Sequence, residues 1–312
     1  MLILLKLNLP LLEELCLINS PSGLEFPMTT YIINYCYQIK GIQYKIDKVG
    51  NLFITKNTTS PKTYPCLIAH MDEIHNLNIP RKIMLKNNLI WAVTEDTKQP
   101  CGLGADDKFG ICIILQLLKI LPDIKVCFTV QEESYGIGAI EAQLNSEFFS
   151  NIRFMIEPDR RGNSDIIVET NCLKIASDEF LEDISDLLQK YKYKPAIGTF
   201  TDIGVLKETV NVSAINLSCG YYKEHTSREY GRLNELEKCL NLIYDIINKA
   251  IKVYVHDSPD KAYCSWYYDT YGDDGISNLD NYSTISYAEA SYICHNCKEH
   301  DCSKCKIWEI AR

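Results

Sequence analysis

The chain has 312 residues, of which 46% are hydrophobic and 23% charged, so it is long enough for a large α/β domain with an appendage. Its net charge of -9 disfavours nucleic acid as a partner, because proteins that bind phosphate backbones usually carry a basic surface. We also expect no membrane partner, because no apolar run is long enough to cross a bilayer.

The first 18 residues are apolar, but their pattern is that of a helix and not of an export signal. Lys6, Pro10, Glu13 and Glu14 interrupt the segment, and no small-residue cleavage site follows it. Residues 10–18 carry apolar side chains at helical spacing, which predicts an amphipathic first helix. We therefore expect a cytoplasmic protein whose 14 cysteines are reduced thiols.

Predicted helices and strands alternate from about residue 10 to 255. Residues 44–56 are typical of a β-hairpin that turns at Gly50-Asn51. Further strands are predicted over 66–70, 124–130, 152–157, 165–169 and 211–218, and helices over 106–121, 177–191 (with Ser177 as its N-cap) and 233–254. Strands that are apolar on both faces are typical of parallel sheets, which helices cover on both sides. The sequence thus predicts an α/β fold with a mostly parallel central sheet sandwiched by helices.

The composition changes near residue 257. We predict a main domain over 1–256 and, over 257–312, a tail rich in Tyr, Asp and Ser. The tail ends in two CxxC pairs, formed by Cys294, Cys297, Cys302 and Cys305. Four thiolates suit one structural Zn²⁺ and, less well, an iron–sulfur cluster, whereas free reduced cysteines fit the pattern as well as zinc does.

Side chains that bind metals cluster at the ends of the predicted strands. The residues concerned are His70 and Asp72, Asp106 in the turn "GLGADDKFG", Glu132 and Glu133, Glu157 and Asp159, and His225. Taken singly, each fits a surface histidine, a helix cap or a solvated turn. In a parallel sheet, however, they would meet at one edge, where gathered carboxylates repel one another unless cations neutralise them.

The order His-x-Asp, Gly-x-x-Asp-x-Lys, Glu-Glu, Asp and a late His resembles the co-catalytic dizinc exopeptidase superfamily. That group includes peptidase T-like tripeptidases, single-domain leucyl aminopeptidases, glutamate carboxypeptidases and aminoacylase-type deacylases. The resemblance covers about residues 10–255 and implies a catalytic domain over 1–256 with two Zn²⁺, or Co²⁺ or Mn²⁺ in their place. Only 35 residues separate His70 from Asp106, and 65 separate Asp159 from His225, so we expect no inserted lid domain.

The resemblance also implies a role for each residue of the cluster. It implies five metal ligands: His70 and Asp159 for one ion, Glu133 and His225 for the other, and Asp106 as the bridge between them. Glu157 is the alternative to Asp159, because "EP" resembles the carboxypeptidases whereas "DRRG" fits the aminopeptidases.

Four further roles concern catalysis and substrate. Glu132 would be the general base, and Asp72 would orient His70 as a metal-bound imidazole requires. Thr201 and Asp202, in "GTFTDIG", would contact the substrate.

The expected function is that of a zinc-dependent exopeptidase, an aminopeptidase that hydrolyses short peptides with a metal-bridging hydroxide and a Glu general base. An N-acyl amino-acid amidohydrolase or a carboxypeptidase could use the same dizinc site. An alternative of another class is an inactive metal-binding interaction protein. The sequence predicts no particular oligomeric state.

Overall fold

The computed structural model describes residues 4–59, 62–75, 80–170 and 173–257. The four tail cysteines lie outside the described residues, so a zinc site there and the division into 1–256 and 257–312 both stay predictions. In the part that is described, no helix is long and apolar enough to cross a membrane.

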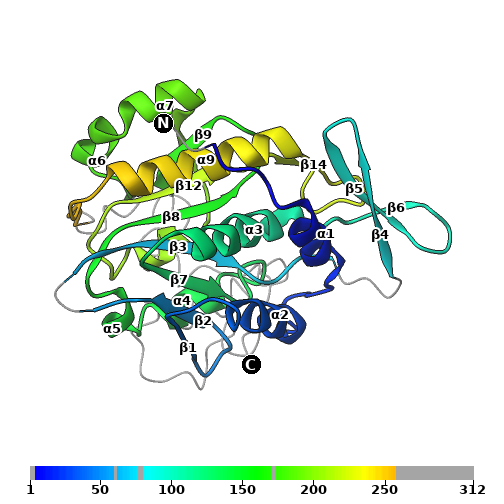
Figure 1. The fold of residues 1–312 in the computed structure, drawn as a ribbon, viewed down its shortest axis with the longest axis horizontal. Helices are drawn as coiled ribbons and strands as arrows, with labels where there is room; N and C mark the ends of the chain where they lie inside the picture. The colour runs from blue at the N-terminus through cyan, green and yellow to red at the C-terminus, as the bar shows by residue number, and fades with distance from the viewer. Residues whose placement is uncertain (1–3, 60–61, 76–79, 171–172, 258–312) are drawn as a thin grey trace, which may run out of the picture. The chain divides into compact units, whose positions relative to one another are not determined.

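Four parallel strands form the centre of the main sheet (Figure 1). They lie in the order β7 (Ile124–Thr129), β3 (Tyr64–His70), β8 (Ile152–Arg160) and β12 (Ala214–Ser218). Antiparallel strands extend the sheet at both sides, namely β1 (Ile42–Ile46) and β2 (Leu52–Lys56) beyond β7, and β9 (Asp165–Thr170) and β10 (Leu173–Lys174) beyond β12. A further strand, β11 (Lys194–Gly198), pairs in parallel with β9. The predicted mostly parallel central sheet is confirmed.

Helices cover both faces of this sheet. One face carries α1 (Leu9–Leu17), α2 (Phe26–Cys36), α3 (Ala105–Ile120), α6 (Asp178–Asp183), α7 (Ser185–Tyr191) and α9 (Leu233–Lys249). The other carries α4 (Ile137–Ala142), α5 (Ser146–Phe149) and α8 (Asp202–Leu206). Within β3, Leu67 and Ala69 join the first core, whereas Cys66 and Ile68 join the second. Burial on both faces explains why this strand is apolar throughout.

Two predicted helices differ from the observed ones. The helix expected over 177–191 is divided at Ile184, which leaves the helical conformation and is fully buried. Ser177 does cap its first part, since its hydroxyl accepts from the Phe180 amide at 3.2 Å. The closing helix ends at Lys249 instead of 254, because Tyr254 bonds through its backbone to Arg153 and Ser213 near the sheet.

A second, antiparallel sheet was not predicted. It contains β4 (Arg81–Lys86), β5 (Leu89–Thr94), β6 (Pro100–Cys101), β13 (Tyr221–Tyr222) and β14 (Tyr230–Arg232). The β4–β5 hairpin projects away from the main sheet (Figure 1) and occupies the interval between His70 and Asp106. Pairing of β14 with β5 places the loop between β13 and β14, which carries His225, near the start of α3.

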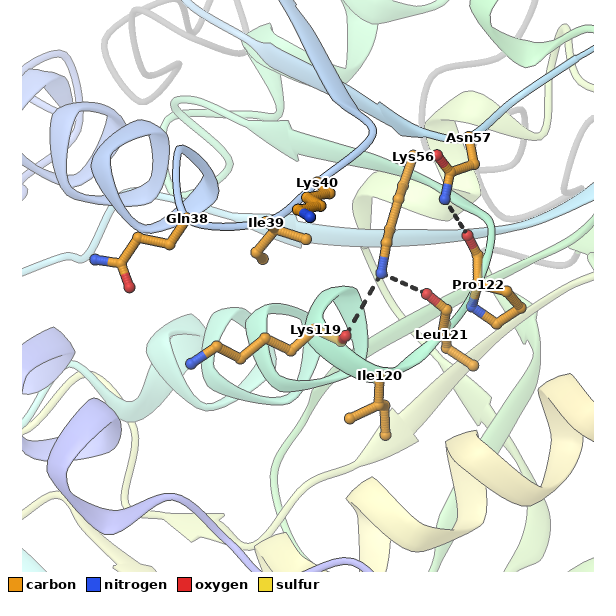
Figure 2. Close-up of a pocket in the computed structure, with 9 residues that line it drawn as sticks. All are labelled: Gln38, Ile39, Lys40, Lys56, Asn57, Lys119, Ile120, Leu121 and Pro122. Carbon is orange, nitrogen blue, oxygen red and sulfur yellow. Dashed lines mark hydrogen bonds between the residues drawn. The ribbon is translucent and has the colours of Figure 1, made fainter.

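The far end of α3 is held by a buried lysine. Lys56 donates to the carbonyl oxygens of Leu118 at 2.7 Å and Leu121 at 2.6 Å, and reaches that of Lys119 at 3.5 Å. A cation there complements the negative end of the helix dipole. A hollow of about 420 Å³ opens beside this contact (Figure 2). It lies at the opposite end of α3 from Asp106, so it belongs to the scaffold of the helix and not to the cluster of ligands.

Candidate metal centre

His70 lies at the tip of β3 with only 1% of its surface exposed. Its Nδ1 lies 3.0 Å from the backbone oxygen of Asp72 and donates to it, which leaves Nε2 as the ring's lone-pair nitrogen. That nitrogen faces two carboxylates, at 3.0 Å from Asp106 Oδ1 and 3.7 Å from Asp159 Oδ1. Burial lowers the pKa of His70, but hydrogen bonds to Asp106, Asp159 and Asp72 outweigh burial and raise it well above its ordinary value. The arrangement therefore attracts a cation to Nε2, either a proton or a metal.

The Asp72 carboxylate organises more than the histidine beside it. It accepts hydrogen bonds from the Ser22 hydroxyl at 2.6 Å and from the amides of Glu132 at 2.9 Å and Glu133 at 3.1 Å. Its Oδ1 lies 3.4 Å from His70 Nδ1, farther than its own backbone oxygen. Asp72 thus holds the turn after β7 against the tip of β3.

Asp106 stands between two histidines at the entry to α3. Gly104 reaches the helix with φ of 68°, and Asp106 and the next residue depart from helical geometry. Asp106 Oδ1 faces His70 Nε2 at 3.0 Å, whereas Oδ2 faces His225 Nε2 at 3.2 Å. Burial raises the pKa of Asp106, but hydrogen bonds to His225 and His70 outweigh it and lower the pKa below its ordinary value. One oxygen is thus directed to each side of the site.

Glu133 and His225 form the second side. Glu133 Oε1 lies 2.8 Å from His225 Nε2, yet it is buried and has no partner with hydrogen-bond geometry among the described residues. His225 is 42% exposed at its side chain, and the carboxylates of Asp106 and Glu133 raise its pKa to about 11. An imidazole nitrogen and a carboxylate oxygen this close together can bind one cation.

Of the two alternative ligands after β8, the structure brings Asp159 to the cluster. Asp159 joins His70 and Asp106, and the Tyr221 hydroxyl donates to its Oδ1 at 3.1 Å. Glu157 is fully buried behind it and accepts from the Thr201 hydroxyl and, at 3.4 Å, from the Ile203 amide. Burial and the charge of Asp106 raise the pKa of Asp159 well above its ordinary value.

Thr201 and Asp202 are buried behind the cluster, with exposed fractions of 4% and 0%. Thr201 bonds to Glu157, and Asp202 accepts from the Thr129 hydroxyl. As substrate contacts these two residues stay a prediction. Their burial favours a supporting role, because each binds a side chain at the end of a central strand.

Glu132 lies beside the ligands in the turn after β7. A carboxylate oxygen of Glu132 falls within 4.8 Å of ligand atoms of His70 and Glu133. Burial raises the pKa of Glu132 well above its ordinary value, although the nearby His70 opposes this effect. Glu132 therefore lies within reach of the atoms that would surround a cation, where a carboxyl group can transfer protons.

The residues fit two metal ions. Ligand atoms of His70, Asp106 and Asp159 lie within 4.8 Å of one another, as do those of Asp106, Glu133 and His225, so Asp106 is common to both groups. Two ligands of one tetrahedral Zn²⁺ lie about 3.3 Å apart when each bond is about 2.0 Å. The four pairs of ligand atoms given above, at 2.8, 3.0, 3.2 and 3.7 Å, bracket that value. Imidazole and carboxylate ligands suit zinc, cobalt and manganese.

Two buried features near the site were not predicted from the sequence. Glu229, four residues after His225, accepts hydrogen bonds from the backbone before α3. Glu73 forms ion pairs with Arg81 and, at 2.6 Å, with Lys108, where all three side chains are buried. The only sequence pattern that could have indicated Glu229 is its place four residues after His225, on the same short loop. No sequence pattern pairs Glu73 with Arg81.

Comparison of sequences identifies no relative, since no family model and no curated protein matches. Solved structures do match. The aminopeptidase PepT of Bacillus cereus is 16% identical, with a TM-score of 0.64 over 78% of this chain and 98% of that one. A tripeptidase of Staphylococcus aureus is 17% identical, with a TM-score of 0.64 over 77% and 96%. The TET1 peptidase of Pyrococcus horikoshii is 18% identical, with a TM-score of 0.55 over 77% and 98%. The expected fold is confirmed: the chain shares the fold of these peptidases.

Proposed function

We propose that the chain is an aminopeptidase that uses two Zn²⁺, or Co²⁺ or Mn²⁺, to remove residues from the amino end of short peptides. The observation that carries the proposal is the pair of ligand groups that share Asp106, with Glu132 beside them. The names of the structural neighbours, aminopeptidase and tripeptidase, support the peptide substrate.

In this proposal one ion is held by His70 and Asp159, the other by Glu133 and His225, and both by Asp106. Two divalent ions bound there would lower the pKa of a water between them and polarise the carbonyl of the scissile bond. Three ligand carboxylates offset most of the ions' charge, and the burial of His70 and Asp159 shields that side of the site from bulk solvent.

Glu132 has the task that a ligand cannot perform. It accepts the proton of the attacking water and delivers it to the leaving amine, a role that its position beside His70 and Glu133 supports. Asp72 holds the amides of Glu132 and Glu133 together, so that the base and the ligand keep a fixed separation.

A substrate panel tests the proposal. Purified protein is supplied with zinc, cobalt or manganese and incubated with free-amine di- and tripeptides, the same peptides acetylated at the amino end, and N-acyl amino acids. We expect cleavage of the free-amine peptides alone, with release of the first residue. Cleavage of the acylated peptides from the carboxyl end would indicate a carboxypeptidase, and cleavage of N-acyl amino acids alone an amidohydrolase. Two bound metals without cleavage of any member would favour an inactive binding protein.

A further inference from the structure

A buried carboxylate outside the ligand set binds the backbone that carries Asp106. Glu229 is 1% exposed and lies on the loop between β13 and β14. Its Oε2 accepts from the amides of Leu103 at 2.9 Å and Gly104 at 2.7 Å. Its Oε1 accepts from the amides of Ala105 at 2.9 Å and Asp106 at 3.3 Å. Four consecutive backbone N–H groups therefore meet one side chain.

These amides are the ones that the start of a helix leaves without partners. Gly104 is the N-cap of α3 and has no side chain that could accept from them. Glu229 supplies the acceptor from more than a hundred residues away, and its negative charge complements the positive end of the helix dipole. The result is a cap that fixes both the start of α3 and the backbone position of Asp106.

Glu229 also contacts the segments that carry His225 and His75. Glu229 lies four residues after His225, and its own amide bonds to Thr226 on that loop at 3.2 Å. Its Oε2 also accepts from His75 Nε2 at 3.2 Å, on the segment that follows His70. The His75 ring packs against Gly102, where a Cβ atom would come within 2.2 Å of it. Glu229 thus joins the segments that carry His70, Asp106 and His225.

We propose that Glu229 is a positioning residue that sets the distance between Asp106 and His225, and thereby the affinity of the second ion. The inference rests on the proposed dinuclear site, but not on the identity of the substrate. It predicts an effect through metal binding, because Glu229 touches neither the ligand atoms nor the region where they converge. A glutamine in its place would offer one oxygen and present an N–H group to backbone N–H groups, so about half of the bonds would be lost.

The test compares the full-length parent protein with Glu229→Gln, Glu229→Asp and the control Glu224→Gln. Glu224 lies on the same loop, but its carboxylate pairs at 2.6 Å with Arg161 on the surface. Zinc stoichiometry and stepwise affinity are measured by competition with a chromophoric chelator, thermal unfolding by circular dichroism, and kcat and KM at increasing zinc concentration.

We expect Glu229→Gln to bind the ion on the side of His225 about 10–100-fold more weakly, the usual effect of losing a group that orients a ligand. The ion on the side of His70 should be weakened less, because Asp106 is shared by both ions but His225 is not. The kcat of this variant should be low at limiting zinc and should recover at saturating zinc, because all five ligands are intact. Glu229→Asp, which keeps the charge, should fall between Glu229→Gln and the parent and carries the test if Glu229→Gln does not fold. Glu224→Gln should match the parent.

Parent affinity for both ions in a folded Glu229 variant would overturn the inference. So would equal weakening of both ions, or a low kcat that persists with both sites filled. If the parent binds two ions but cleaves no peptide, the proposed function fails while the affinities still decide the role of Glu229.

Discussion

The two oxygens of Asp106 face different histidines, which makes this side chain the link between the two ligand groups. Asp106→Ala should therefore lose both ions, whereas Glu133→Gln should weaken only the ion on the side of His225. Metal content after dialysis, measured by inductively coupled plasma mass spectrometry, checks this prediction. Unchanged metal content in Asp106→Ala would contradict the bridging role.

Glu132 and Glu133 are neighbours in sequence, but they are proposed to have different tasks. Glu132→Gln keeps the size of the side chain and removes its ability to accept a proton. It should retain both ions and bind peptide, while kcat falls by about 10²–10⁴-fold. Glu133→Gln should lose metal affinity together with rate. Metal content and peptide turnover are measured on each variant, and turnover at the parent rate in Glu132→Gln would show that the mechanism is wrong.

Asp159 and Glu157 could not be distinguished by strand alternation, because residues two apart point to the same face. Their depth differs: Glu157 is bound by Thr201 behind the site, whereas Asp159 reaches His70 and Asp106. Asp159→Asn should abolish turnover and weaken one ion. Glu157→Gln, the matched control, should have a smaller effect on both, and the reverse ranking would reassign the ligand to Glu157.

At the scale of elements, the sequence predicted those helices and strands whose positions follow from a local pattern of apolar residues. The central strands are apolar on both faces and α3 is apolar all round, so their positions could be read directly. The hairpin β4–β5 was missed because its apolar runs, Ile83–Leu85 and Leu89–Val93, are short, and periodicity alone does not distinguish such runs from buried helix segments. The contacts of Glu229 with residues 103–106 join positions far apart in sequence, and no local pattern reports such a pair.

The buried lysine at the end of α3 makes a prediction about the stability of that element. Lys56→Met keeps the apolar stem and removes the donor to the carbonyls of Leu118 and Leu121. The free energy of unfolding should fall by about 1–3 kcal/mol, because buried carbonyl groups lose a charged partner. Urea unfolding measures the change, with exposed Lys40→Met as the matched control. Equal stability of the two variants would show that Lys56 does not hold the helix end.

The proposed ligands connect distant elements of the described chain, since they come from the ends of β3, β7 and β8, the start of α3 and the loop before β14. Ions that bind only the folded chain should stabilise it by about 4 kcal/mol when free metal is 1,000 times the dissociation constant. A chelator should therefore lower the melting temperature of the parent and leave that of Asp106→Ala unchanged. A parent insensitive to the chelator would contradict a metal site that joins these elements.

The pH dependence of the chelated protein follows from its buried acids. Burial raises the pKa of Glu132, Glu157 and Asp159 above the values that they have in the unfolded chain. An acid with a raised pKa in the folded state binds protons more tightly there, so stability is present at low pH and is lost as pH rises through the folded pKa. Neighbouring carboxylates raise the pKa of His225 to about 11, so its contribution to stability also decreases as the pH rises above its ordinary pKa of 6.5. Because the contribution of His225 is lost from its ordinary pKa of 6.5 upward, the melting temperature of the chelated parent should fall from pH 6 to pH 8, and that of His225→Gln should fall less. In saturating zinc the parent should show a weaker decline, because the ions replace the protons as the positive charges of the site. A chelated parent that became more stable over this range would contradict the charge balance inferred for the cluster.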